Sequence, residues 1–101
     1  MRNRDRMEII SRILEAVNEG GRDGSTRTRI MYNAFVSHAQ MKEYLSNLED
    51  NGMLHYDLKG QKFKITEKGL EFIRIYTEIN EMIKIPPRPG PTTERQQQYV
   101  M

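Results

Sequence analysis

The chain has 101 residues, with 16 Lys and Arg against 14 Asp and Glu, so its net charge is only +2, and it contains no cysteine. A chain of this length holds one domain, which we expect to be followed by a short tail. The lack of cysteine excludes a disulfide scaffold, a thiolate zinc site and a cysteine nucleophile. No apolar run approaches the roughly 20 residues that cross a bilayer, and the basic N-terminus has no apolar core behind it. We therefore expect no signal peptide and a cytoplasmic location.

The small net charge predicts no strong overall attraction to nucleic acid, so such an affinity would depend on local clusters of cations. Three clusters occur: Arg2, Arg4 and Arg6; Arg22, Arg27 and Arg29; and Lys59, Lys62 and Lys64. The same residues also fit an ordinary solvated surface, which is the simpler interpretation of scattered charge.

Residues 7–19 have the spacing of an amphipathic helix. Its apolar residues recur at intervals of three and four: Ile10, Ile13, Leu14 and Val17. Asp5 is the expected N-cap, with Glu8 at the capping-box position, and Gly20 and Gly21 end the helix. A short second helix then begins near Ser25 or Thr26. It carries Ile30, Met31 and Ala34, and it is interrupted at Phe35 and Val36.

A third helix has the clearest start signal in the chain. Ser37 is a good N-cap, Gln40 stands at the reciprocal capping-box position, and Val36 and Met41 occupy the hydrophobic-staple positions. Asn51 and Gly52 end this helix. The inward stripe is predicted to be Met41, Leu45 and Leu48. The opposite face shows Gln40, Glu43, Ser46, Asn47 and Asp50.

Two short strands, 53–58 and 62–65, follow the third helix. Residues 59–61, Lys-Gly-Gln, join them, which predicts a hairpin with glycine in the turn. Thr66 caps a last helix, and this helix extends to residue 84 or 85, where two prolines prevent its continuation. Residues 86–101 are rich in proline and then in glutamine, and we expect them to form a disordered tail.

The last helix carries two apolar sets. Phe72, Ile75, Ile79 and Met82 have the three-four-three spacing of a coiled-coil seam, and Leu70, Ile73, Tyr76 and Ile83 form the second set. One set can pack on the domain, while the other would be exposed in a monomer. We therefore predict a homodimer whose interface includes Phe72, Ile75, Tyr76, Ile79, Met82 and Ile83. The alternative is a single wide stripe that is buried within one chain.

The order helix, short helix, tight turn, capped helix, hairpin, helix predicts a winged helix-turn-helix, a mainly α fold with a small β-hairpin. We expect the winged-helix domain at 1–65, a C-terminal dimerisation helix at 66–85 and the tail at 86–101. In such proteins the third helix enters the major groove, and the hairpin, called the wing, reaches the backbone. The candidate DNA contacts are Thr26, Arg27, Thr28, Arg29, Ser37, His38, Gln40, Lys42, Glu43, Asn47, Lys59, Gln61 and Lys62.

The chain also resembles a known family, the archaeal winged-helix chromatin proteins first described from Sulfolobus and called the "ten-a" family. The matching pieces span roughly residues 7 to 84: Glu8-Ile9-Ile10, Ile13-Leu14-Glu15-Ala16, Thr28-Arg29-Ile30-Met31-Tyr32 with Ala34 and Ser37, Tyr44-Leu45, Leu48, and Ile65-Thr66 with Lys68-Gly69. The resemblance implies a DNA-binding winged helix that dimerises through an antiparallel coiled coil of its last helix. It further implies a nucleoid-associated chromatin protein or transcription regulator.

Glu43 departs from the family pattern, which tends to place a basic residue there. A carboxylate at this position can accept a hydrogen bond from cytosine, but it repels phosphate. Glu43 and the small net charge favour the alternative function, a winged-helix module that binds another protein and has little DNA affinity.

The sequence offers no catalytic or cofactor site. His38 and His55 lie on different elements without metal-ligand spacing, and no glycine motif for nucleotide phosphates is present. Nothing pairs a nucleophile with a base, so we expect no enzyme activity, no cofactor and no metal. His38 fits either a DNA contact or a packed or half-exposed position without one, and His55 is expected at the surface.

Overall fold

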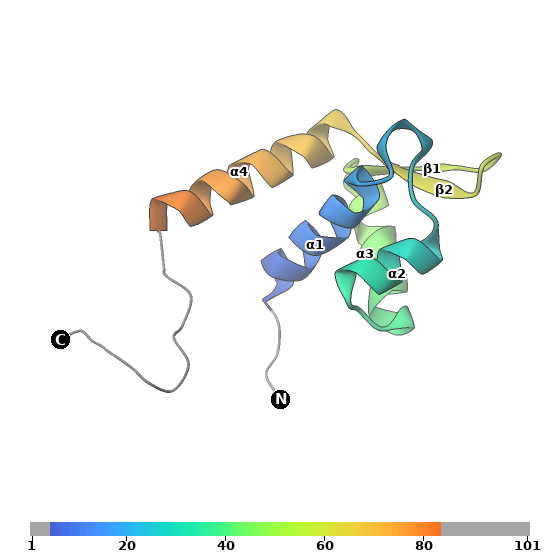
Figure 1. Ribbon diagram of the computed structural model, residues 1–101, viewed down its shortest axis with the longest axis horizontal. Helices are drawn as coiled ribbons and strands as arrows, with labels where there is room; N and C mark the ends of the chain where they lie inside the picture. Colours follow the sequence, from blue (N-terminus) through green and yellow to red (C-terminus); the bar gives the residue numbers. More distant parts are fainter. Residues whose placement is uncertain (1–4, 84–101) are drawn as a thin grey trace.

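The computed structural model describes residues 5–83, and Figure 1 shows the arrangement of its elements. In chain order they are α1 (Arg6–Asn18), the 3-10 turn η1 (Gly21–Asp23), α2 (Arg27–Ala34), α3 (His38–Asp50), β1 (Leu54–Asp57), β2 (Lys62–Ile65) and α4 (Glu67–Ile83). The predicted order is confirmed. The loop after α1 also contains the short η1 turn, which was not predicted. The first strand is one residue shorter at each end than the predicted 53–58.

The core lies where the apolar stripes of α1, α2 and α3 meet, and the hairpin closes one edge. Its buried members include Ile9, Ile13, Leu14 and Val17 from α1, Ile30 and Ala34 from α2, Met41, Leu45 and Leu48 from α3, and Leu54 and Phe63 from the hairpin. Ile9, rather than the predicted Ile10, is fully buried at the start of the α1 stripe. Each such side chain contributes about 1.5–3 kcal/mol by leaving water, so this small core stabilises the domain.

The helix starts show which capping predictions are confirmed. The Ser37 hydroxyl accepts from the Gln40 N–H at 3.1 Å, and the Gln40 side chain accepts from the Ser37 N–H at 3.4 Å, so the predicted capping box is present. Thr26 caps α2 by accepting from the Arg29 N–H at 3.2 Å. The prediction for Asp5 is wrong in part, because it occupies the N-cap position but its side chain makes no capping hydrogen bond.

The hairpin pairs Tyr56 with Phe63 and Asp57 with Lys62 in an antiparallel register. Its turn differs from the prediction, because the left-handed residue is Gln61, with φ of 57°, and not Gly60. The Asp57 carboxylate accepts from the Lys59 N–H at 3.2 Å, and the Asp57 carbonyl accepts from the Gln61 N–H at 2.7 Å. Asp57 therefore organises the turn, and the glycine does not supply the left-handed conformation.

Ser25 joins the loop before α2 to the hairpin. Its N–H and C=O exchange two 2.8 Å hydrogen bonds with Phe63, and its buried hydroxyl donates to the Ala16 carbonyl at 3.0 Å. The preceding Gly24 has φ of 83°, and a Cβ there would lie 2.4 Å from the Phe63 carbonyl oxygen. Glycine is required at this position, because the loop backbone passes so close to β2.

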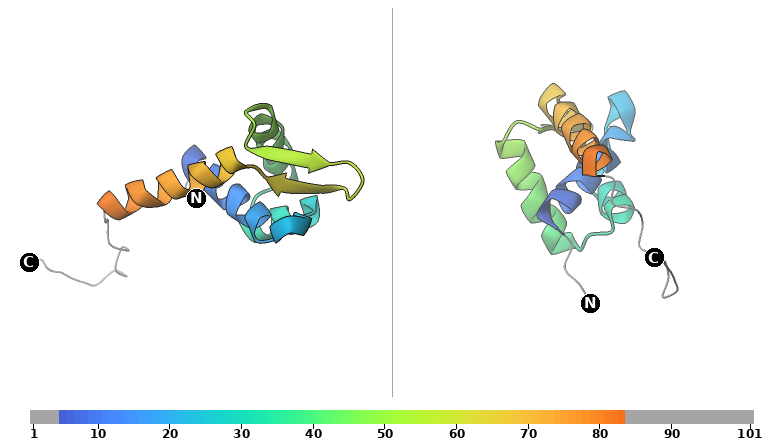
Figure 2. Two further views of the ribbon diagram at one scale, coloured as in Figure 1. Left: turned by 90° about the horizontal axis from the view of Figure 1, so that it is seen from above. Right: turned by 90° about the vertical axis from the view of Figure 1, so that its left-hand side faces the viewer.

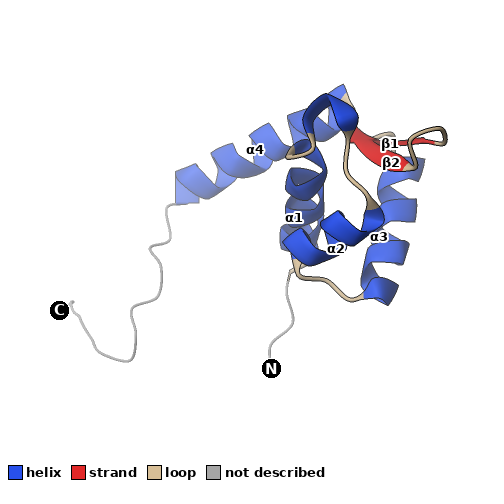
Figure 3. Ribbon diagram, turned by 45° about the vertical axis from the view of Figure 1, so that its right-hand side comes forward, coloured by secondary structure: helices blue, strands red, loops and turns tan. Residues whose placement is uncertain are grey.

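Helix α4 and the hairpin project from the domain in opposite directions, as two views in Figure 2 and Figure 3 agree. The Thr66 hydroxyl accepts from the Gly69 N–H at 3.2 Å, so the predicted cap is present. Phe72 and Ile73 pack against the core, and Tyr76 is half-buried. Residues 84–85 of the predicted last helix and the predicted tail, 86–101, lie outside the described residues. Within residues 5–83, no helix has the length and apolar character that a membrane span requires.

Candidate nucleic-acid interface

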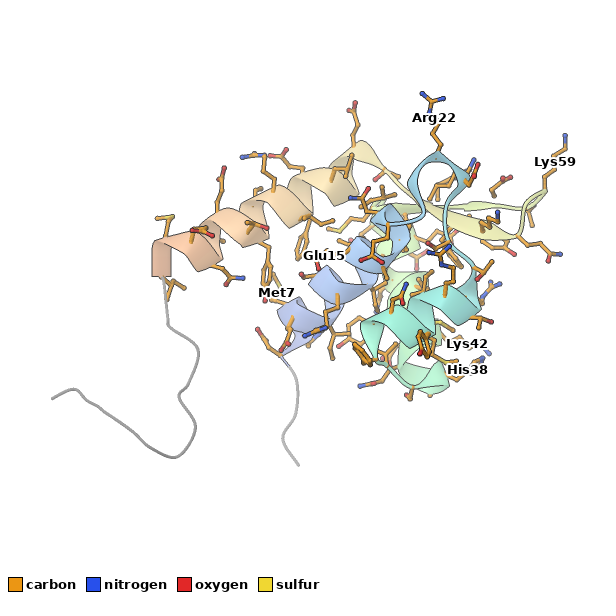
Figure 4. The ribbon with its side chains drawn as sticks, in the orientation of Figure 1. Met7, Glu15, Arg22, His38, Lys42 and Lys59 are labelled. Carbon is orange, nitrogen blue, oxygen red and sulfur yellow. The ribbon has the colours of Figure 1, made fainter. Side chains whose placement is uncertain are left out.

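The hairpin and α3 are neighbours on the side of the domain opposite to the Ile83 end of α4 (Figure 3). Figure 4 shows Lys42 and His38 on α3 and Lys59 at the tip of the hairpin. Arg22 points away from the domain at the η1 loop, far from Lys42 in this view. Of the cations in the second predicted cluster, Arg22 is therefore separated from the α3 face.

The outward face of α3 is formed by exposed polar residues: His38, Lys42, Glu43, Ser46, Asn47 and Asp50. His38 is exposed, so it does not pack in the core. His55 is exposed on β1, as predicted. The face is negative overall, because Lys42 is opposed by Glu43, Glu49 and Asp50 along the same helix.

Ser37 and Gln40, two candidate DNA contacts, are both exposed and already joined by the capping box. Their side-chain oxygens accept backbone N–H groups at the start of α3. The Ser37 O–H and the Gln40 NH₂ group therefore remain available to a ligand. The oxygen lone pairs that accept the backbone N–H groups do not.

Arg27, in the first turn of α2, lies over the aromatic rings of the hairpin. Its guanidinium carbon is 4.9 Å from the Tyr56 ring centre and 5.1 Å from the Phe63 ring centre. Its Nη1 donates to the Tyr56 hydroxyl at 3.4 Å. This cation–π contact links α2 to the hairpin, and sequence reasoning did not predict it.

A hollow of about 170 Å³ lies between α2, α3 and β2. It is lined by Arg27, Lys42, Leu45, Ser46, Glu49 and Phe63. Two cations and one hydroxyl thus face one carboxylate at the junction of the hairpin with α3. Ser46 and Glu49 were not among the candidate contacts, although their spacing from Lys42, four and seven residues, places all three on one side of the helix.

The hairpin tip presents exposed Lys59 and Gln61, and the half-buried Lys62 begins β2. Lys64 forms an ion pair with Asp57 at 3.7 Å, so this member of the lysine cluster is partly neutralised within the hairpin. Leu58, beside Lys59, is 81% exposed, so an apolar side chain also stands at the tip.

The start of α2 places Thr28 and Arg29 on the surface beside Arg27. Thr28 also lines a second, larger hollow of about 690 Å³ with Glu19, Met31, Tyr32, Asn33, Phe35 and Val36. This hollow is mostly apolar, and Tyr32 is 79% exposed at its edge. This hollow was not predicted, because its lining combines residues from the end of α1, from α2 and from the loop before α3.

Helix α4 divides its apolar residues differently from the two predicted sets. Phe72 from the first set and Ile73 from the second both pack on the core, because both lie in the half of the helix that contacts α1. Leu70, Ile75, Ile79, Met82 and Ile83 are exposed. Tyr76 stacks on Phe72, with ring centres 6.1 Å apart and planes 9° from parallel.

Arg74 lies on α4 among carboxylates of the same helix. It forms a short hydrogen-bonded ion pair with Glu71 and a second ion pair with Glu78 at 2.9 Å. The hydrogen bond and the charge of Glu71, followed by the charge of Glu78, raise the pKa of Arg74 above its usual value. In the described part of the chain, no group of three or more His, Cys, Asp or Glu is arranged to hold a metal ion.

Three helices with a capped third helix and an adjacent two-stranded hairpin define the winged helix-turn-helix class. The model of the winged helix-turn-helix family matches residues 3–84, and the chain belongs to this family. Among solved structures it is similar to Sso10a-2, a DNA-binding protein from Sulfolobus solfataricus. The two chains are 25% identical over 80% of this chain and 83% of the other, with a TM-score of 0.68. The predicted resemblance to the Sulfolobus "ten-a" proteins is thereby confirmed. No curated protein matches the chain.

Proposed function

We propose that this protein binds double-stranded DNA as a homodimer and acts as a nucleoid-associated chromatin protein or a transcription regulator in the cytoplasm. The observation that carries the proposal is the junction where α2, α3 and the hairpin meet. It gathers Arg27 and Lys42 beside the wing, in a fold similar to that of a Sulfolobus DNA-binding protein. Neither a cofactor nor an enzymatic step is part of this proposal.

In the proposed complex, α3 lies in the major groove and the wing lies along the backbone. His38, Glu43 and Asn47 face the bases, because the first turns of a recognition helix meet base edges. Arg27, Arg29, Lys59 and Lys62 contact phosphates, where flexible or planar cations need no sequence information. Thr26, Thr28, Ser37, Gln40, Lys42 and Gln61 complete the contact surface.

Dimerisation is proposed through the far half of α4. Ile75, Ile79, Met82 and Ile83 are all exposed, and Met82 has 83% of its surface open. Exposed apolar residues on one helix mark a surface for a partner, since water contact with them is unfavourable. The pairing includes Phe72 and Tyr76 at its domain end, and residues 66–85 act as the dimerisation segment.

Fluorescence anisotropy with a random-sequence duplex, measured across a range of salt concentrations, tests DNA binding. Each phosphate contact releases counterions, so log K should fall linearly with log[salt] by about 0.9 per contact. Four cations per protomer predict a slope of about −3.6 for one protomer, on the same relation. Binding that is absent at low salt would contradict the proposal.

A protein-interaction module is the second candidate. The observation that favours it is the negative α3 face, with Glu43, Glu49 and Asp50 against Lys42. This candidate predicts no measurable affinity for duplex at low salt, so the same titration separates the two functions. A duplex affinity that does not change with salt would contradict the proposed phosphate contacts, because each such contact releases counterions.

A further inference from the structure

The guanidinium of Arg27 is held by rings, whereas Arg12 and Arg74 are held by carboxylates. Arg12 pairs with Glu8 at 3.4 Å, and Arg74 pairs with Glu71 and Glu78. Within residues 5–83, no carboxylate forms an ion pair with Arg27. Its charge is therefore oriented by the protein without being neutralised.

The ring platform under Arg27 is itself fixed. Tyr56 and Phe63 are cross-strand partners with ring centres 4.7 Å apart, and Phe63 is buried in the core. The two backbone hydrogen bonds between Ser25 and Phe63 hold the loop just before Arg27 against the same strand. The base of the arginine and the rings beneath its head group are thus parts of one rigid unit.

We propose that Tyr56 is a positioning residue for DNA binding: it holds Arg27 at the junction of the wing and α3, where the guanidinium binds one backbone phosphate. This inference rests on the proposed function and assigns a role to a residue that need not touch DNA. The guanidinium carbon lies over the two rings and Nη1 donates to the Tyr56 hydroxyl, which leaves most of the five N–H donors free. A planar fork of donors is suited to two parallel hydrogen bonds to a phosphate.

Lys42 and Ser46 line the same hollow and add an ammonium group and a hydroxyl donor. Glu49 also lines it and opposes an anion there. Two cations against one carboxylate leave the junction positive, provided that Arg27 stays in place. Without the Tyr56 ring, the long arginine side chain samples many rotamers. Binding a phosphate then costs the conformational entropy of ordering this side chain.

A double-mutant cycle on duplex affinity tests the proposal in the full-length protein. Its variants are Arg27→Ala, Tyr56→Leu and the two combined, with Tyr56→Phe as the matched control. A cation–π contact of about 0.5–2 kcal/mol converts to an increase in Kd of roughly 2- to 30-fold for Tyr56→Leu. We expect the combined variant to bind no more weakly than Arg27→Ala alone, because Tyr56 acts only through Arg27. Tyr56→Phe should stay within about twofold of wild type, since it keeps the ring and loses one long hydrogen bond.

Two further measurements separate positioning from a general effect on folding. The side-chain CH₂ protons of Arg27 should show an upfield ring-current NMR shift that is reduced in Tyr56→Leu, where only the Phe63 ring remains beside the guanidinium, and kept in Tyr56→Phe. Arg27→Lys should weaken binding in the wild-type background but not in the Tyr56→Leu background, because lysine lacks the planar head that the ring holds. Arg27→Lys leaves Tyr56 and Phe63 in place, and thermal unfolding of the Tyr56→Leu proteins checks that the second background is folded.

Additive effects of the two single substitutions, or wild-type affinity in Tyr56→Leu, would overturn the positioning role while leaving DNA binding intact. A wild-type protein with no salt-dependent affinity would overturn the proposed function and, with it, this inference.

Discussion

Two exposed regions differ in how they use charge and apolar surface. One is the junction of α2 with the hairpin, and the other is the far half of α4. At the junction, aromatic rings are covered by a cation and the cation keeps its charge. On α4, the cation Arg74 is neutralised by two glutamates of its own helix, while apolar side chains remain uncovered.

This difference teaches which ligand suits each region. An oriented cation without an ion-pair partner among the described residues suits a phosphate, whereas a helix whose arginine is ion-paired and whose Ile79 and Met82 are uncovered suits another apolar surface. The hairpin and α4 also project in opposite directions (Figure 2), so the proposed DNA site and the proposed dimer surface do not overlap. Each substitution below changes one of these two regions and leaves the other intact.

Ile79→Glu is expected to have the largest effect, on assembly. It would bring two like charges to the centre of an apolar seam, and burying an unpaired carboxylate costs several kcal/mol, so we expect the dimer to weaken more than about 100-fold. Size-exclusion chromatography with light scattering should give a monomer at micromolar concentration. The control Thr77→Glu, at an exposed position outside both apolar sets, should stay dimeric. A dimeric Ile79→Glu protein would place the partner surface elsewhere.

Arg27→Ala combined with Arg29→Ala should have the second largest effect, a loss of DNA affinity. Two charge-assisted contacts of about 1.5 kcal/mol each convert to a loss of more than 100-fold for every sequence. The salt slope should fall by about two units, one for each phosphate contact. The control Arg12→Ala with Arg74→Ala removes the same charge from residues that are already ion-paired, and it should change the slope little. Equal slopes in both double variants would exclude a backbone contact by α2.

Replacing Lys59 and Lys62 with Glu should lower affinity by roughly tenfold, because exposed lysines act as point charges with modest energies. The loss should be similar across a panel of unrelated duplexes measured by anisotropy. A loss restricted to particular sequences would instead make the wing an element that determines specificity.

Glu43→Arg should have the smallest effect and the opposite sign. It changes the local charge by two units within a Debye length of about 8–10 Å of the proposed phosphates, so we expect roughly threefold tighter nonspecific binding. Glu15→Arg, on the exposed side of α1, is the control for net charge alone. Weaker binding of the Glu43 variant would mean that the carboxylate makes a favourable base contact or that α3 does not face DNA.

Much of the fold could be predicted because its signals are local. The Ser37–Gln40 capping box, the Thr26 cap and the α3 stripe depend on residues within a few positions of each other, and the structure contains all of them. The left-handed conformation of Gln61 was not predicted, because the turn was expected to depend on Gly60. Asp57 organises this turn instead, through its side chain and its carbonyl.

The junction could not be predicted in full, because it joins residues distant in sequence. The pairing of Tyr56 with Phe63 follows from the hairpin register, and alternation in the strands is the signal that could have indicated it. The contact with Arg27 additionally needs the Ser25 bridge, which no local pattern indicates. The division of α4 between core and solvent depends on where α1 ends beside it, so helical spacing alone assigned Phe72 and Ile73 to different sets.

A chemical-shift map of the ¹⁵N-labelled protein, titrated with a short duplex at low salt, tests the central contrast most directly. The account predicts that amide shifts concentrate at residues 26–29, 42–47 and 58–62, while residues 75–83 keep their free-state positions. Shifts confined to 75–83, or a spectrum that does not change on addition of duplex, would contradict the assignment of DNA to the junction and of the partner protomer to α4.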